Sequence, residues 1–164
     1  MHPSALPVEA LLAECDERRL RRSGPGGQHR NKVETAVVLT HRPTGVSAEA
    51  NERRSQQQNR EAATHRLRLR LAVEHREPWG GSPTDRWRAR LGGARLAINP
   101  ANEAFPALLA EALDAIAASD WDEASAAQRL GVSRSRLLKF LAIEAEGLAV
   151  LNRHRAVRGL KPLS

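Results

Sequence analysis

The fold of this chain is decided by residues 23–59, SGPGGQHRNKVETAVVLTHRPTGVSAEANERRSQQQN, which join a glycine-rich basic loop to two short apolar segments and a helix start. Gly26 and Gly27 lack a Cβ and tolerate positive φ, so the backbone there can approach another molecule closely. The carboxamide of Gln28 is uncharged, and any catalysis by this loop would therefore depend on hydrogen bonding and positioning rather than on proton transfer. A glycine-rich loop by itself is more often an ordinary solvated turn, so its interpretation depends on the residues around it.

Two strands and a helix are expected after the loop. Residues 36–41 are mainly apolar and residues 46–51 alternate between apolar and polar, and both patterns are typical of strands. The RPTG sequence between them fits a tight turn with Pro second and Gly fourth. Ser55 and Gln58 form a Ser-x-x-Gln capping box, which predicts a helix from there to about Val73. The RLRLRL run near its end would suit a strand equally well by period, but the cap and the length favour a helix.

The second half of the chain has a different texture. A Pro- and Gly-rich cluster at residues 78–83 predicts the end of the first domain. An Ala- and Leu-rich helix is expected at 103–118, and residues 122–141 match a helix-turn-helix, with small Ala127 at the helix crossing and Gly131 in the turn. We therefore expect a domain at 11–76, a linker at 77–101 and a helical module at 102–164 that ends in a short, solvated basic tail.

Several short motifs follow one another along residues 16–71. They are SGPGGQ at 23–28, Asn31-Lys32, Glu34-Thr35-Ala36-Val37, Pro43-Thr44-Gly45, and Arg54-Ser55-Gln56 followed by Asn59. In this order they resemble the catalytic domain of the class I peptide-chain release factors and of the codon-independent ribosome-rescue peptidyl-tRNA hydrolases. Two features depart from that pattern: Arg30 stands where the family usually has a small apolar residue, and residues 16–22 are more charged than usual.

The resemblance implies an α+β fold, in which a small mixed sheet carries the GGQ loop and packs against a helix. An all-α, helix-turn-helix-like module is expected to follow it. The implied activity is hydrolysis of the peptidyl-tRNA ester, a carboxylic ester, in the peptidyl-transferase centre of the large ribosomal subunit, with water as nucleophile and no cofactor. Gly26, Gly27 and Gln28 would be catalytic. Gln28 would also be the target of a glutamine methyltransferase, because this glutamine is commonly methylated in the family.

Positive charge is concentrated where the resemblance lies. Residues 16–76 hold 14 Lys/Arg and 7 Asp/Glu, whereas the remainder of the chain holds 12 of each. A general preference for arginine would spread the excess evenly, so its concentration favours a polyanion-binding surface, with ribosomal RNA as the expected partner. The residues expected to bind RNA are His29, Arg30, Asn31, Lys32, Arg53, Arg54 and Gln56 in the first domain, and Arg134 and Arg136 in the helical module. Since aromatic residues make up only 3% of the chain, base stacking is not expected to be the main binding device.

Other classes of protein are disfavoured by the sequence. Cys15 is the only cysteine, so an intrachain disulfide and a thiolate zinc site are excluded, and we expect it to lie in the core of a strand. The six histidines show no metal-ligand spacing, and we expect no metal. No apolar run reaches the length of a membrane span and no signal region opens the chain, which predicts a cytoplasmic protein without a membrane partner.

Two functions remain open at this stage. The first is release of peptides from stalled ribosomes, independent of the codon, because no segment is large enough for the codon-reading domain of a true release factor. The alternative is a non-catalytic RNA- or DNA-binding regulator, in which the helix-turn-helix reads nucleic acid. A small helical bundle with a basic surface would explain the same residues, since Asp120, Asp122 and Glu123 offset their charge.

Overall fold

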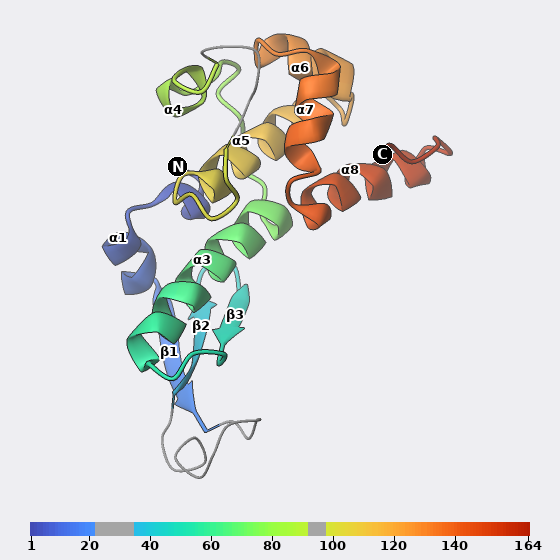
Figure 1. Ribbon diagram of the computed structural model, residues 1–164. Coiled ribbons are helices and arrows are strands. Elements are labelled where there is room, and N and C mark those ends of the chain that lie inside the picture. The colour runs from blue at the N-terminus through green and yellow to red at the C-terminus, as the bar shows by residue number, and fades with distance from the viewer. Residues whose placement is uncertain (22–34, 92–97) are drawn as a thin grey trace. The chain divides into compact units, whose positions relative to one another are not determined.

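The computed structural model describes residues 1–21, 35–91 and 98–164, and these residues form two compact units. The first unit covers residues 3–75 and the second covers residues 76–164 (Figure 1). The first combines a sheet with helices, and the described part of the second is entirely helical. The expected α+β class is confirmed. No helix in the described ranges is long and apolar enough to span a membrane.

A three-stranded sheet forms the centre of the first unit. Its elements in chain order are the 3-10 helix η1 (Pro3–Ala5), α1 (Val8–Ala13), β1 (Cys15–Leu20), β2 (Ala36–His41), β3 (Ser47–Ala50) and α3 (Gln56–Glu74). The strand order is β1-β2-β3, with Cys15 opposite His41 and Val37 opposite Ala50. All described strand pairs are antiparallel, so the expectation of a mixed sheet was wrong. The turn of a few residues between β2 and β3 requires this, because a parallel connection needs a dozen or more.

One face of this sheet packs against α3. The helix begins where the sequence predicted, since the Ser55 hydroxyl accepts the N–H of Gln58 at 3.4 Å. The RLRLRL run is helical, and Leu67 and Leu71 reach the core one turn apart. The core joins these side chains to alternate residues of the strands; its buried members are Leu11, Val37, Leu39, Val46, Ala48, Ala50, Ala63, Leu67 and Leu71.

The turn between β2 and β3 is held from both sides. Gly45 has φ +72°, a conformation that glycine adopts without steric cost, and its N–H donates to the His41 carbonyl at 2.8 Å. The buried His41 ring contacts Thr44 at 2.8 Å and Glu14 at 3.0 Å. Arg42 donates to the carbonyls at the end of α1 and the start of β1. The hairpin is thereby fixed to the N-terminal edge of the sheet.

The second unit is built around one apolar helix. Its helices are α4 (Asp85–Arg88), α5 (Phe105–Ala117), α6 (Glu123–Arg129), α7 (Arg134–Leu141) and α8 (Ala145–Val157). Every residue of α5 from Phe105 to Ile116 is buried, as expected of a helix surrounded by the others. Phe140 of α7 packs against two other rings of this unit. Its ring centroid lies 5.6 Å from those of both Trp87 and Phe105, in edge-on arrangements.

Residues 84–88 are anchored within this unit, in a stretch where the sequence predicted a linker. The Thr84 hydroxyl caps α4 by accepting the Trp87 N–H, and it donates to the Glu111 carboxylate of α5 at 2.6 Å. The Thr84 N–H donates to the same carboxylate at 2.6 Å. Trp87 is fully buried, and its indole N–H donates to the Leu130 carbonyl at 3.0 Å.

The helix-turn-helix pattern is present as α6 and α7. Asp122 caps α6, Ser133 caps α7, and Gly131 occupies the turn with φ +72°. Ala127 is buried where it was expected. The large apolar residues of the motif, Leu130, Leu137 and Phe140, are also buried.

The C-terminal residues are mostly exposed, as the sequence suggested, but they are held against α8. Arg153 lies within α8, which continues to Val157. The side-chain amide of Asn152 pairs with the backbone N–H and carbonyl of Leu163, at 2.8 and 3.0 Å, and Arg155 donates to the Lys161 carbonyl. The last residues therefore fold back along the helix, a contact across eleven positions that local sequence does not encode.

Candidate functional site

The residues expected to be catalytic lie outside the described part of the chain. These are Gly26, Gly27 and Gln28, together with the expected RNA contacts His29, Arg30, Asn31 and Lys32. The structure does describe what precedes and follows them. β1 ends at Leu20, and Thr35 leads directly into β2.

Asn59 holds the residue that follows this segment. Its side chain is fully buried on the first turns of α3. The amide nitrogen donates to the Thr35 carbonyl at 2.7 Å and to the Arg53 carbonyl at 2.9 Å, and the amide oxygen accepts the Arg53 N–H at 2.9 Å. One side chain thus joins the entry to β2, the loop before α3 and α3 itself. The sequence placed Asn59 in a motif but assigned it no role.

A second polar network joins β1 to α3. Arg60 donates to Glu17 at 2.8 Å, and Arg19 donates to the other oxygen of the same carboxylate at 3.3 Å. These hydrogen bonds, that of Arg60 above all, hold the pKa of Glu17 below its ordinary value despite partial burial. With its amide turned to face the strand, Gln56 also accepts from Arg19. Gln56, expected to bind RNA, is thus oriented by β1.

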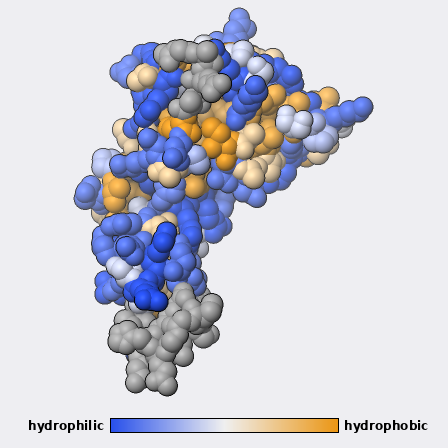
Figure 2. All heavy atoms as spheres, in the orientation of Figure 1, coloured by the Kyte–Doolittle hydropathy of each residue, from blue (hydrophilic) through white to orange (hydrophobic). Residues whose placement is uncertain are grey.

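Arg53 and Arg54 lie in the loop before α3, and both are exposed. The backbone of Arg53 is fixed by Asn59, so its side chain projects from an ordered position. Next to it, Glu52 is bound by Arg66 at 2.7 Å, and that hydrogen bond, with others from the backbone, outweighs burial and lowers the pKa of Glu52. In the view of Figure 2 the surface around α3 is mainly hydrophilic. Both residues were expected to bind RNA, and exposed arginines commonly make phosphate contacts.

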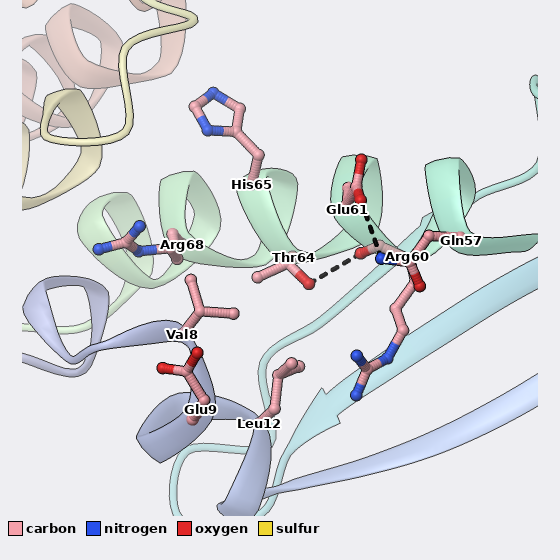
Figure 3. A pocket seen from close by; sticks show the side chains of 9 residues that line it. All are labelled: Val8, Glu9, Leu12, Gln57, Arg60, Glu61, Thr64, His65 and Arg68. Atoms are coloured by element: carbon pink, nitrogen blue, oxygen red, sulfur yellow. Dashed lines mark hydrogen bonds between the residues drawn. The ribbon is translucent and has the colours of Figure 1, made fainter.

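A hollow of about 400 Å³ lies between α1 and α3 (Figure 3). Val8 and Leu12 of α1 face the side of α3 that carries Thr64, whose hydroxyl donates to the Arg60 carbonyl at 2.7 Å. Acidic and basic side chains both line the hollow, and Arg68 is used to bind the carbonyls of η1 and the residue after it. The lining therefore favours no one class of ligand.

Arg134 and Arg136 of the helical module have different surroundings. Arg134 donates to the buried Glu123 carboxylate at 2.6 Å, and Arg155 of α8 binds the same group at 3.1 Å. Burial alone would raise the pKa of Glu123, but the hydrogen bond from Arg134 and the charges of both arginines outweigh it and lower the pKa. Arg134 is thus part of an ion-pair network that joins α6, α7 and α8. Arg136 is half-exposed and lies two positions further along α7, where residues two apart do not face the same side of a helix.

Cys15 and the potential metal ligands form the last group of candidate site residues. Cys15 is half-buried at the start of β1, where its thiol donates to the Leu11 carbonyl at 3.2 Å, and burial raises its pKa. Such a thiol is a poor nucleophile. Among the described residues, no three His, Cys, Asp or Glu side chains gather as a metal site would require.

The order of the helices and strands, the position of the loop in the sequence and the motifs together indicate one known type of protein domain. The RF-1 domain matches residues 8–90, about half of the chain, and the chain belongs to this family. Peptide chain release factor 1 of Caulobacter vibrioides is 40% identical over 92 residues, which are 55% of this chain and 26% of that protein. Peptide chain release factor 2 of Variovorax paradoxus is 45% identical over 67 residues, which are 41% of this chain and 18% of the relative.

A chloroplastic protein is also similar. The chloroplastic peptide chain release factor PrfB1 of Arabidopsis thaliana is 48% identical over 73 residues, 42% of this chain and 16% of the relative. The chain spans about a quarter or less of the length of these relatives. No solved structure matches it.

Proposed function

We propose that this chain hydrolyses the ester bond of peptidyl-tRNA on the ribosome. The observation that carries the proposal is the RF-1 domain match over residues 8–90, a range that contains Gly26, Gly27 and Gln28. The described structure supports it, because β1 and β2 are antiparallel neighbours on either side of this segment and Asn59 fixes the residue where β2 is entered. A role in translation termination follows from the family relationship.

The proposed hydrolysis depends little on ionisable side chains. When water attacks the ester, negative charge develops on the carbonyl oxygen and on the departing ribose oxygen. A backbone N–H at Gln28, brought close by the flanking glycines, would stabilise that charge. The Gln28 side chain would shape a pocket for water, and its amide would be the substrate of a glutamine methyltransferase. Ribosomal RNA of the large subunit would be bound by residues 29–32 and by the exposed Arg53 and Arg54.

Peptide release from purified stalled ribosomal complexes tests this proposal. Gln28→Ala and Gly27→Ala should each slow release by about 10²–10³-fold, the usual cost of losing one such donor, and leave ribosome binding nearly intact. Two matched controls should release at the wild-type rate: Gln128→Ala, an exposed glutamine of α6, and Gly80→Ala, where an added Cβ meets nothing within 4 Å. Equal release by the loop variants and the controls would refute the proposal.

We further propose that release is independent of a stop codon. The support is that the second unit extends well beyond the family match, since its helices α5 to α8 all lie after residue 90. Complexes programmed with stop, sense or truncated messages should then release equally well, apart from a dependence on how much mRNA extends beyond the A site. Strict dependence on a stop codon would overturn this.

The role of the helical module in recruitment needs variants other than Arg134. A glutamate at that position would face the buried Glu123 carboxylate and break the ion-pair network, so loss of function would report unfolding. Arg136→Glu with Lys139→Glu changes two cations of α7 outside that network. Reduced ribosome binding by this double variant, with unchanged helix content, would support recruitment through α7, and wild-type binding would exclude it.

The alternative function is a non-catalytic regulator that reads nucleic acid with the helix-turn-helix. The capped helices α6 and α7 and the Gly131 turn favour it. However, Arg134, at the start of the second helix where base contacts are normally made, is bound to Glu123. Sequence-specific DNA binding that persists in Gln28→Ala, together with an absence of peptide release by the wild type, would favour this alternative.

A further inference from the structure

Two of the three tryptophans of the chain lie outside the apolar core of the second unit. Trp87 is fully buried, whereas Trp79 and Trp121 are half-buried and each lies against a basic side chain. The Arg129 guanidinium lies 4.6 Å from the centre of the Trp79 ring. The His154 ring is stacked on Trp121, with centroids 3.4 Å apart and planes 9° from parallel. Surfaces that bind single-stranded nucleic acid combine aromatic side chains, on which bases stack, with cationic side chains that follow the backbone.

The two pairs are joined at the C-terminal end of α5. Arg129 donates to the Ala118 carbonyl and to the Ser119 hydroxyl, both at 2.9 Å. Ser119 is two residues from Trp121, so the cation over one indole is bonded to the turn that presents the other. α6, which carries Arg129, packs against α5 (Figure 1). The aromatic residues therefore belong to one continuous region of the second unit.

The turn that presents Trp121 adopts an unusual conformation. Asp120 and Trp121 have φ values of +52° and +59°, and they are the only positive-φ residues other than glycine in the described chain. Non-glycine residues adopt this region at a steric cost, and such residues cluster at functional sites. This turn directs the Trp121 indole toward α8, where it stacks on the His154 ring. A glycine in either position would close the same turn without strain, so packing of the helix end alone does not explain these residues.

Cations surround the stacked pair. Arg153 of α8 and Arg158, which follows the end of that helix, are exposed, and their charges, with that of Arg76, act on the His154 ring. Burial, and then these charges, lower the pKa of His154, so the stack is neutral at pH 7. Arg153 has one long contact to Glu146 at 3.7 Å, with both side chains more than 60% exposed, and the Arg158 guanidinium has no hydrogen bond or ion pair to any described residue. Two guanidinium groups are thus available to an anionic partner beside a flat, uncharged ring pair.

We infer that this aromatic–arginine surface, made of Trp79, Trp121, Arg129, Arg153, His154 and Arg158, binds single-stranded RNA. Phosphates would contact Arg153 and Arg158, and unpaired bases would contact the indole rings. An acidic protein would satisfy the arginines but not the flat aromatic faces, and duplex nucleic acid would keep its bases stacked on each other. All six residues belong to the second unit, and the inference does not rest on the proposed hydrolysis.

The test uses the full-length protein and a fluorescein-labelled single-stranded RNA of ten nucleotides, with anisotropy measured across a salt series. Arg153→Glu with Arg158→Glu should weaken binding and reduce the slope of log K against log[salt] by about 1.4, because each phosphate contact on a single strand contributes about 0.7. The matched control is Arg86→Glu with Arg90→Glu, which makes the same charge change at exposed positions of the same unit. A loss of affinity and slope as large in the control as in the surface variant would overturn the inference.

A second measurement separates stacking from charge. RNA should quench the tryptophan fluorescence of the wild type, and the quenching should fall in Trp121→Phe. Trp121→Leu should lose affinity by about 5- to 150-fold, the usual cost of one base–aromatic stack, at unchanged helix content. Affinity equal to wild type in Trp121→Leu, or displacement of the RNA by polyglutamate at equal charge concentration, would show that charge alone acts and would exclude the proposed surface.

Discussion

Replacing Asn59 by alanine should destabilise the first unit and leave the second unchanged. The substitution removes three hydrogen bonds from a fully buried side chain and leaves the Thr35 and Arg53 backbone groups without these partners. At about 1 kcal/mol for each bond, the expected loss is about 3 kcal/mol, and more where a backbone group stays unsatisfied. A unit of this size has a total stability of roughly 4–11 kcal/mol, so the loss is a large fraction of it.

Urea unfolding followed by two signals measures this effect. All three tryptophans lie beyond residue 76, so their fluorescence reports the second unit, whereas circular dichroism reports both. With an m value of about 1 kcal/mol per molar urea, the dichroism component of the first unit should shift by about 3 M while the fluorescence transition stays in place. Gln57→Ala, an exposed neighbour on α3, should shift neither signal by more than about 0.5 M. A change below about 1 kcal/mol for Asn59→Ala, or an equal shift in fluorescence, would refute the reasoning.

Three further changes test the packing of the second unit. Since the folded-state pKa of Glu123 is lowered, its stabilising effect is complete above pH about 4.5 and is lost as the pH falls through the folded value; Glu123→Gln should therefore reduce stability at pH 7 and flatten the acid dependence measured by fluorescence. Gly131→Ala should cost about 1–2 kcal/mol because φ is +72°, whereas Gly80→Ala should cost less than about 0.5 kcal/mol in the same urea titration. Thr84→Val should lower the melting temperature, since removal of the hydroxyl bond to Glu111 and of the helix cap costs about 1–2 kcal/mol.

The parts of the fold that the sequence predicted are those with local causes. Ser55 caps α3 through a residue three positions away, and Gly45 adopts the positive φ that its turn requires. The two strands after the loop lie within one or two residues of their expected limits, because the apolar run of β2 and the alternation of β3 can both be read directly from the sequence. The helix-turn-helix was equally visible, since its small and apolar positions are fixed by the crossing of two adjacent helices.

The parts that could not be predicted depend on partners distant in sequence. Thr84 and Trp87 stand in a Pro- and Gly-rich stretch with the composition of a linker, and only Glu111 and the Leu130 carbonyl show that they are anchored. The ion pair of the exposed Arg134 could not be predicted, because a charge count does not show that Glu123 is buried. The stacking of Trp121 on His154 could not be predicted, because it joins residues more than thirty positions apart.

The excess of positive charge in the first unit likewise does not show what its individual arginines bind. Several of its arginines have structural tasks: Arg42 and Arg68 bind backbone carbonyls, Arg60 and Arg66 bind Glu17 and Glu52, and Arg70 binds Glu74. The net charge of the unit is unchanged by these contacts, so its long-range attraction for RNA remains. The number of guanidinium groups able to bond a phosphate is smaller than the number of arginines, however, and salt dependence reports phosphate contacts rather than net charge. We therefore expect Arg53 and Arg54, exposed on a loop whose backbone Asn59 fixes, to contribute more to the proposed RNA binding than their share of the charge would indicate.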